Sequence, residues 1–382
     1  MDKARHAFIV NDFPPIIGGQ SSYLYYLCSA LPPEKIVVLA PCCGNTSVFD
    51  RAQPFRIVRK PYLIDVQVLE KLAKILLPFF YVQRILRDED IALLHCAHIL
   101  STGFIGLAMK VFRNIDYVLY THSADILEYE HHPFFRPLLQ EILSQAKHVV
   151  TNSRYTQGVL ERLGVDAGKI VISSPRIDAA DFGGLFCPDE VVRKYGLMGK
   201  RIILSINRLV PRKGNDVMIK AMPRILKRFP DAVYIVYGDG PCQMMLKDLV
   251  KELGLQMSVL FADPDDGDLR REWMAACEVF VMVSRAIEAT GDVEGFGVVY
   301  LEAGAAGKPV VAGDSGGVPD AVEDGVNGFL VDPLDENAVA EAICRLLESQ
   351  ALAALLGAQG RERVKARFDY RRGVPELSDI FK

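Results

Sequence analysis

Short apolar runs separated by segments of helix length form two consecutive series along this chain of 382 residues. The first series reads HAFIV, KIVVLA, FRIVR, ALLHC, YVLYT, HVVTN and KIVIS, and the second reads RIILSIN, AVYIVYG, SVLFA, VFVMV, PVVAG and GFLVD. Helices are expected between them, for example at 21–31, 66–87 and 335–349. Continuous apolar strands that alternate with helices are typical of parallel sheets covered on both faces. The sequence therefore predicts an α/β protein with two such sheets.

Two Rossmann-like domains that face each other across an interdomain cleft are the expected architecture. Glycine, proline and aspartate concentrate between Pro175 and Glu190, which indicates the seam. We expect an N-terminal domain at 1–180 and a C-terminal domain at 181–365, with a C-terminal helix at about 366–382 that packs back on the first domain. In open parallel sheets, ligands bind beyond the carboxyl ends of the strands, near a switch in strand order. The residues that follow each strand are therefore the candidates for function.

Composition excludes several other classes of protein. The net charge of −4 argues against general affinity for nucleic acid. Eight cysteines without a C-x-x-C motif indicate reduced thiols rather than a disulfide or zinc framework. The N-terminus lacks the apolar core of a signal peptide, and no run approaches the ~20 apolar residues of a membrane span. We expect a cytoplasmic protein without a bound metal.

Two loops that follow strands could hold phosphate. The first, NDFPPIIGGQSSY, has Gly18 and Gly19, which let the backbone approach a ligand, and Ser21, which is expected to cap the next helix. Anions bind well at a helix N-terminus. The second, RLVPRKGN, places Arg208 and Lys213 in a loop between a strand and a helix. An ordinary glycine turn and a solvated basic loop fit the same residues.

The segment DVEGFGVVYLEAGAAG carries two glutamates, Glu294 and Glu302. In one continuous helix they would be separated by roughly 12 Å of rise, whereas the carboxylate pairs of glycosidases lie about 5–9.5 Å apart. We therefore expect Glu294 in the loop before a helix and Glu302 in its second turn. The N–H groups of 297–299 would lie between them and could bind a phosphate. A capping glutamate and a solvated helix glutamate are the alternative interpretation.

These motifs together resemble those of the retaining GT-B glycosyltransferases. Glu294 and Glu302, which are separated by seven residues and have Gly-Phe-Gly after the first, look like the signature of that family. Arg208 and Lys213 match its phosphate-binding pair, the Gly18-Gly19 loop matches its N-terminal glycine loop, and Thr121-His122 matches the histidine that ends a late strand. Within the family, the stretches NDFPPIIGGQSSYL, RLVPRKGND and GDVEGFGVVYLEA look most like those of the GDP-mannose-dependent phosphatidylinositol monomannoside mannosyltransferases.

The resemblance implies a metal-independent hexosyltransferase without a cofactor, which moves mannose from GDP-mannose to a lipid-linked or glycan acceptor. It assigns catalysis to His122, Glu294, Arg208 and Lys213, and donor binding to Gly18, Gly19, Arg208, Lys213, Glu294, Gly295, Phe296, Gly297, Val298, Val299 and Glu302. In this assignment Glu302 binds the ribose, Arg208 and Lys213 bind the diphosphate, and Glu294 binds the sugar. His122 approaches the sugar from the N-terminal domain.

The chain also departs from the family's pattern. Ser123 follows the histidine where a glycine is usual, and the acidic stretch ADPDDGD at 262–268 replaces a glycine near the base pocket. That stretch lacks the final glutamate of an EF-hand, so we interpret it as a solvated loop. Three alternatives remain: a UDP-sugar-dependent transferase of the same fold, a nucleotide-sugar epimerase, and a binding protein without turnover.

The segment 56–87 combines basic residues with the apolar run ILLPFFYV. Basic and apolar residues on one helix can lie on an anionic membrane, although a core helix with basic flanks has the same composition. Because this part of the family's N-terminal domain often contacts acceptor or membrane, we expect a peripheral protein of the inner face of the plasma membrane, active in glycolipid biosynthesis. The oligomeric state is left open.

Overall fold

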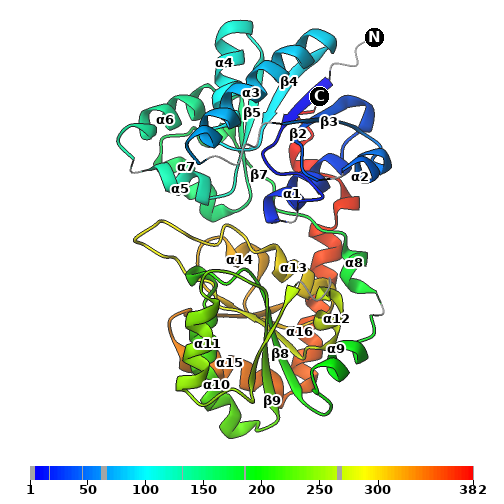
Figure 1. Cartoon of the computed structure of the whole chain (residues 1–382), viewed down its shortest axis with the longest axis vertical. Coiled ribbons are helices and arrows are strands. Elements are labelled where there is room, and N and C mark those ends of the chain that lie inside the picture. Colours follow the sequence, from blue (N-terminus) through cyan, green and yellow to red (C-terminus); the bar gives the residue numbers. More distant parts are fainter. Residues whose placement is uncertain are drawn as a thin grey trace. The chain divides into compact units, whose positions relative to one another are not determined.

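A computed structural model describes residues 5–16, 18–44, 46–61, 67–130, 132–184, 186–264 and 269–381, with the backbone alone over 67–76. The chain divides into an N-terminal unit, Met1–Ile177 with Tyr370–Lys382, and a C-terminal unit, Asp178–Asp369 (Figure 1). The expected division was 1–180 and 181–365. Both units are α/β, and each contains one parallel sheet.

The sheet of the N-terminal unit has seven parallel strands in the order β3-β2-β1-β4-β5-β6-β7. The strands are β1 (Arg5–Ile9), β2 (Ile36–Pro41), β3 (Arg56–Lys60), β4 (Ile91–Cys96), β5 (Asp116–Thr121), β6 (His148–Thr151) and β7 (Ile170–Ile172). Each lies on one of the seven predicted runs. The strand order reverses between β1 and β4, which defines the switch point of this sheet.

Helices cover both faces of this sheet because successive strand residues point to opposite sides. Ala7 and Ile9 pack in the cluster formed with α3, α4, α5, α6 and α7, whereas Phe8 and Val10 pack with α1 and the C-terminal segment. The helices are α1 (Gly19–Ser29), α2 (Ser47–Ala52), α3 (Gln67–Asp88), α4 (Thr102–Arg113), α5 (Ala124–Glu130), α6 (Phe135–Gln145) and α7 (Arg154–Arg162), with 3-10 turns at Pro33–Lys35 and Ala167–Lys169.

The C-terminal unit has six parallel strands in the order β10-β9-β8-β11-β12-β13, with its switch point between β8 and β11. They are β8 (Arg201–Ile206), β9 (Ala232–Tyr237), β10 (Val259–Ala262), β11 (Val279–Met282), β12 (Val310–Gly313) and β13 (Gly328–Val331). The helices are α8 (Ala179–Gly183), α9 (Asp189–Lys194), α10 (Asn215–Arg228), α11 (Gln243–Glu252), α12 (Arg270–Ala276), α13 (Val298–Ala305), α14 (Val318–Ala321), α15 (Glu336–Glu348) and α16 (Gln350–Arg363), with a 3-10 turn at Pro211–Lys213.

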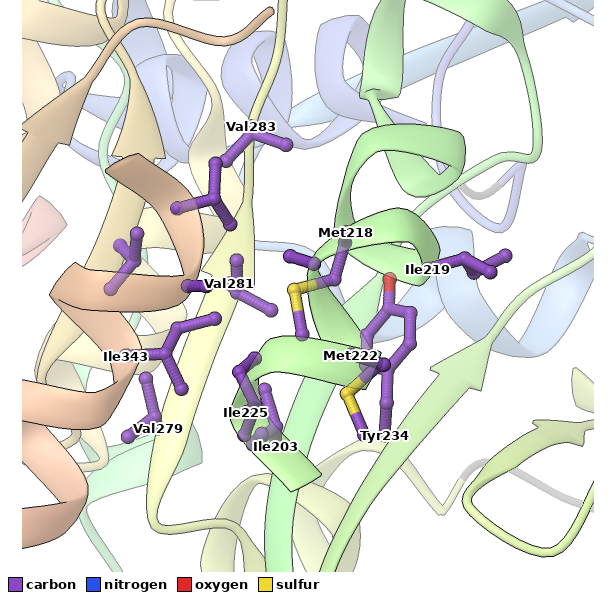
Figure 2. Packing of buried hydrophobic residues seen from close by; sticks show 14 of the residues in the cluster. Ile203, Met218, Ile219, Met222, Ile225, Tyr234, Val279, Val281, Val283 and Ile343 are labelled. Carbon is purple, nitrogen blue, oxygen red and sulfur yellow. The ribbon is translucent and has the colours of Figure 1, made fainter. Parts of the chain in front are cut away.

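Figure 2 shows the core on one face of this sheet, where α10 and α15 pack against β11. Met218 of α10 lies beside Val281 of β11, Met222 lies beside the ring of Tyr234, and Ile343 of α15 belongs to the same cluster. Asp335 accepts the N–H groups of Asn337 and Ala338, so it caps α15 as predicted. The apolar positions of these helices therefore recur at the spacing that buries one helical face.

The predicted C-terminal helix at 366–382 is wrong. The chain instead forms a π-helical turn at Val364–Phe368 and 3-10 turns at Tyr370–Arg372 and Pro375–Leu377. Gly373, with a φ of 70°, and Pro375 interrupt a regular helix. Two further expectations, for the acidic loop at 262–268 and for the basic segment, fall partly outside the described residues, at 265–268 and 62–66.

Candidate functional site

The basic loop and the two glutamates meet at the carboxyl edge of the C-terminal sheet. Arg208 and Lys213 follow β8, and Glu294 follows β11, the strand that pairs with β8 across the switch point. Gly214 brings the two segments into contact, because a Cβ there would lie 2.1 Å from the Val283 carbonyl oxygen. With a φ of 70°, this position strongly favours glycine. The topology therefore places the basic loop beside the segment that carries the glutamate.

Lys213 and Glu294 form a buried ion pair. The Lys213 Nζ donates to the Glu294 Oε2 at 2.5 Å, and both side chains are only 11% exposed. The Arg212 Nε lies 3.7 Å from the same carboxylate oxygen, and its Nη1 donates to Asp292 Oδ1 at 2.9 Å. The main-chain carbonyl of Glu294 accepts the Gly317 N–H at 2.9 Å. Glu294 is thus held through both its side chain and its backbone.

The charge state of Glu294 follows from these neighbours. Burial raises the pKa of the Glu294 carboxyl, but Lys213 and then Arg212 lower it by more, so the net pKa lies below the ordinary value. The carboxylate is therefore ionised at neutral pH. Arg208, by contrast, is exposed and pairs with no carboxylate in the described part of the chain.

Helix α13 begins beside this ion pair, as predicted. Gly297 is its N-cap, with a φ of 89°, and a Cβ there would lie 2.4 Å from the ring of Tyr300. The Tyr300 hydroxyl donates to the Met282 carbonyl at the end of β11, at 2.7 Å. The first N–H groups of the helix, at Val298 and Val299, therefore start at the same sheet edge. Glu302 is half-buried in the second turn.

Phe296, one of the predicted donor-binding residues, has a packing role. Its side chain is only 2% exposed and meets the ring of Phe368 edge-on, with centroids 5.8 Å apart. Only the backbone of Phe296 is available to a ligand at this edge, and Gly295 before it is half-buried. The glycine-phenylalanine-glycine motif thus fixes the loop through one buried ring and one constrained turn.

The glycine loop of the N-terminal unit precedes α1, which begins at Gly19 with Gly18 as its N-cap. A Cβ at either glycine would meet no described atom within 4 Å, so local packing does not demand glycine. Ser21 does not cap the helix as predicted, because it lies within the first turn and its hydroxyl donates to the Ile16 carbonyl at 2.7 Å. Arg59 steadies the loop by donating to the Pro14 carbonyl.

His122 follows β5 at the carboxyl edge of the N-terminal sheet. Its ring meets that of Tyr23, on α1, edge-on with centroids 5.0 Å apart, so His122 lies against the helix that follows the glycine loop. Its main-chain N–H donates to Asp125 Oδ1 at 2.9 Å, while its buried Nε2 has no partner among the described atoms. Burial lowers the pKa of His122; Asp125 raises it and His98 lowers it. The net pKa is below the ordinary value, so the imidazole is neutral at pH 7.

Several other buried polar atoms at this edge have no hydrogen-bond partner in the described part of the chain. They lie at the ends of β5 and β6 or in the segments that follow β1, β4 and β5: Asn11 Oδ1, His98 Nδ1, Thr121 Oγ1, Asp125 Oδ2 and Thr151 Oγ1. Such atoms are uncommon because each one costs free energy to bury. Their concentration at one sheet edge indicates a place where hydroxyl groups or water bind. Sequence reasoning named only Thr121 among them, as part of the Thr121-His122 match, although each lies within four residues of the end of a predicted strand.

Sequence reasoning also missed Asp292, which bridges to Arg212, because nothing in the motif separates it from other loop carboxylates. The predicted residues fall into two groups. Arg208, Lys213, Glu294, the start of α13 and Glu302 lie at one edge of the C-terminal sheet, and the glycine loop and His122 lie at the edge of the N-terminal sheet.

Comparisons with known proteins assign both units to the same class. The family model described as Glycosyltransferase Family 4 matches residues 17–181, and the one described as Glycosyl transferases group 1 matches residues 189–363. The GDP-mannose-dependent alpha-(1-6)-phosphatidylinositol monomannoside mannosyltransferase of Mycolicibacterium smegmatis is 29% identical over 381 residues, covering 97% of each chain. A monoacylated-substrate counterpart from Corynebacterium glutamicum is also 29% identical, covering 100% of this chain and 99% of the relative.

Among solved structures, the Anabaena protein Alr3699/HepE, in complex with UDP and glucose, superposes with a TM-score of 0.80 at 21% identity and covers 99% of each chain. This similarity establishes the GT-B fold. Within the described residues, no helix is both long enough and apolar enough to cross a bilayer.

Proposed function

Because the chain is a group 1 glycosyltransferase of the GT-B fold, we propose that it transfers mannose from GDP-mannose to a lipid-linked or glycan acceptor, with retention of configuration at the sugar. The observation that carries the proposal is the buried Lys213–Glu294 pair beside the N-terminus of α13. It supplies a cation, an anion and free N–H groups at one switch point, which suits a ligand that joins a sugar to a diphosphate.

The donor would lie along this edge of the C-terminal unit. Lys213, exposed Arg208 and the N–H groups of Val298 and Val299 bind the diphosphate, and Glu302 accepts hydrogen bonds from the ribose hydroxyls. Glu294 accepts from the sugar hydroxyls. Since Lys213 and Glu294 neutralise each other without ligand, the diphosphate must draw the lysine charge toward itself while the carboxylate keeps its position.

In the reaction, the bond between the sugar C1 and the leaving phosphate oxygen breaks while a bond from C1 to the acceptor oxygen forms on the same face. The departing diphosphate takes the proton of the acceptor hydroxyl. Arg208, Lys213 and the N–H groups of α13 stabilise the negative charge that develops on the leaving oxygen, a role worth several kcal/mol in other enzymes. His122, buried and neutral, offers a hydrogen bond to a sugar hydroxyl from the N-terminal unit.

Ligand-induced stabilisation tests the donor. At 100 times its dissociation constant, a bound nucleotide adds ~2.7 kcal/mol of apparent stability. We expect GDP and GDP-mannose to raise the melting temperature more than UDP and UDP-glucose do. The named mannosyltransferase relatives support this order. A UDP-sugar is the second candidate, supported by the UDP complex of the Anabaena protein. A larger increase in melting temperature with UDP or UDP-glucose would contradict GDP-mannose as the donor and support a UDP-sugar instead.

Product analysis tests the reaction. Labelled donor is incubated with phosphatidylinositol mannoside acceptors, and the anomeric proton of the product is assigned by NMR. We expect an α-linked product from the α-linked donor. An altered sugar nucleotide formed without any acceptor would instead show an epimerase, and binding without either product would show a protein without turnover.

A membrane surface is the partner that a lipid acceptor requires, and the structure narrows the predicted segment. Arg59 is buried against Asp50, and Leu77 and Phe79 are half-buried against the core, so these three are less available to a membrane. Arg56 pairs with Glu89 but stays 61% exposed. The exposed residues that remain from the predicted segment are Arg56, Phe80, Arg84 and Arg87, of which Arg84 lies 3.6 Å from Asp88. The structure adds three exposed residues of the adjacent helix α4, Val111, Phe112 and Arg113. Arg113 donates to Gln83 at 2.9 Å, which joins the two helices at this surface.

We propose that this surface binds the anionic inner face of the plasma membrane. Each basic residue near such a surface contributes about 1 kcal/mol, screened by salt. Arg84→Glu with Arg87→Glu should abolish sedimentation with phosphatidylglycerol vesicles at low salt. The matched control, Lys220→Glu with Lys227→Glu, reverses two exposed charges on α10 of the other unit and should leave sedimentation intact. If both double variants lost sedimentation equally, the binding would depend on the net charge of the protein and not on this surface.

A further inference from the structure

Ser123 follows His122 and holds a backbone conformation that residues with side chains rarely adopt. Its φ is 75°. The Ala124 N–H donates to the His122 carbonyl at 3.1 Å, which closes a three-residue γ-turn centred on Ser123. A non-glycine residue in such a conformation is strained, and it persists only where its surroundings hold it. The structure must therefore contain contacts that keep this turn in place.

The side chain of Ser123 provides one such contact. It is fully buried, and its Oγ forms a hydrogen bond with the Thr156 Oγ1 of α7. The Thr156 hydroxyl donates to the Asn152 Oδ1 at 2.9 Å, in the loop after β6. Because threonine has a single hydroxyl proton, Ser123 is the donor in its bond with Thr156. A directed chain of hydrogen bonds thus ties the turn after β5 to the neighbouring strand's loop.

The backbone of the same turn fixes His122. The His122 N–H is taken by Asp125 and its carbonyl by Ala124, while the N–H groups of Ile126 and Leu127 donate to the Ser123 carbonyl, each at 3.0 Å. Both main-chain groups of His122 are therefore committed within one turn. The direction of its imidazole then depends on whether the turn keeps its shape.

We propose that Ser123 is a positioning residue, which holds the His122 imidazole in its catalytic orientation by anchoring a strained turn to Thr156. Glycine would adopt the same φ without strain, but it would offer no hydroxyl to Thr156. The contribution to transfer rests on the proposed function, whereas the control of His122 does not.

The test follows the His122 ring directly. The full chain is labelled at its histidines, and the His122 signal is assigned by its loss in His122→Gln. We expect Ser123→Ala and Thr156→Val each to broaden this signal and to shift the pKa of His122 upward toward the ordinary 6.5, because water reaches a loosened imidazole. The kcat of sugar transfer should fall about tenfold, with the donor KM changed by less than about twofold, since the other unit binds the nucleotide.

Two further variants separate strain from anchoring. Ser123→Gly should be at least as stable as Ser123→Ala, yet show the same altered His122 signal. Ser205→Ala, which removes another buried serine hydroxyl on β8, should leave the His122 signal unchanged. If His122 titrates as in the wild type in both Ser123→Ala and Thr156→Val, the positioning role is refuted whatever the activity. If the signal shifts but the wild-type protein transfers no sugar, the proposed function fails and the positioning role stands.

Discussion

The two sheet edges that carry the candidate residues differ in how their buried polar groups are paired. In the C-terminal unit, Lys213, Arg212, Glu294 and Asp292 are charged and neutralise one another. In the N-terminal unit, the buried atoms around His122 are neutral or partly bonded, and several have no described partner. The four charged side chains balance one another, while exposed Arg208 at the same edge has no carboxylate partner among the described residues. Around His122, by contrast, the polar atoms without a described partner belong mostly to uncharged groups.

The difference follows from the free energy of burial. An isolated buried charge costs several kcal/mol, so Glu294 can be buried only with a cation beside it. An unpaired hydroxyl or neutral imidazole costs roughly 1–3 kcal/mol, which a stable unit can tolerate. We infer that, at the charged edge, donor binding moves Lys213 from the Glu294 carboxylate toward the diphosphate. At the other edge, hydroxyl groups of a ligand form hydrogen bonds with polar atoms that have no described partner.

The largest effect is expected from removal of the charge on Glu294. Glu294→Gln should lower kcat for sugar transfer at least ~100-fold, because the sugar loses an ionised acceptor in the transition state. Affinity for GDP, measured by calorimetry, should stay equal or rise, since Lys213 is released for the phosphate. Glu288→Gln, at an exposed position of the same β11–α13 segment, is the matched control. Wild-type kcat in Glu294→Gln would show that the pair is only structural.

Removal of the cation should weaken diphosphate binding. Lys213→Gln is expected to reduce GDP affinity about 30-fold, roughly 2 kcal/mol, which is the contribution of a hydrogen bond to a charged group. GMP affinity should change much less, because the lysine is assigned to the distal phosphate. Calorimetric titration with both nucleotides checks this. Equal losses for GMP and GDP would place the lysine away from the distal phosphate.

Acid should destabilise the N-terminal unit first. His6 Nδ1 and His95 Nε2 lie 2.9 Å apart in its core, and burial, then Lys35 and Lys147, lower the pKa of His6 to about 4. Because the unfolded chain takes up this proton near the ordinary pKa of 6.5 and the folded unit only near 4, the stabilisation is complete above pH 6.5 and is lost as the pH falls toward 4. The loss in the free energy of unfolding is on the order of 1 kcal/mol by pH 5. The stability from Glu294, whose pKa is lowered from 4.5, is lost only below that value.

The single tryptophan separates the two units in this measurement. Trp273 is buried in the C-terminal unit, so its fluorescence follows that unit while far-ultraviolet circular dichroism follows both. We expect two thermal unfolding transitions in the circular dichroism signal, the first from the N-terminal unit. Between pH 7 and 5, the midpoint temperature of this first transition should fall, whereas the midpoint of the transition seen by Trp273 fluorescence should stay the same. His6→Gln should reduce the pH dependence of the early transition. A Trp273 transition that moves first would reverse the comparison.

The smallest effect is expected at the rim of the charged edge. Asp292→Asn removes one partner of Arg212, but both side chains are about 30% exposed, and pairs of that exposure contribute about 0–1 kcal/mol. We expect the equilibrium constant of unfolding and the kcat of transfer each to change by less than about twofold. A loss comparable to that of Glu294→Gln would make Asp292 part of the catalytic cluster.

The secondary structure of the sheets was readable from the sequence because buried parallel strands must be apolar on both faces. Every predicted run became a strand, and α13 begins where the two-glutamate motif placed a helix. The prediction of a C-terminal helix was wrong because Gly373, with its positive φ, and Pro375, which lacks a backbone N–H, prevent a continuous helix there. Phe296 was assigned to the ligand by its motif, although its ring fills the core.

The two α/β units, the basic loop after β8 and the two glutamates around α13 could be predicted from local patterns, since strand periodicity and glycine positions are local properties. The ion pair of Lys213 with Glu294, 81 residues away, and the hydrogen bond of Ser123 with Thr156 became visible in the folded units alone. Ion pairs and hydrogen bonds of this kind depend on which strands are neighbours in the sheet. That order arises from the packing of the whole unit, and no local pattern of residues encodes it.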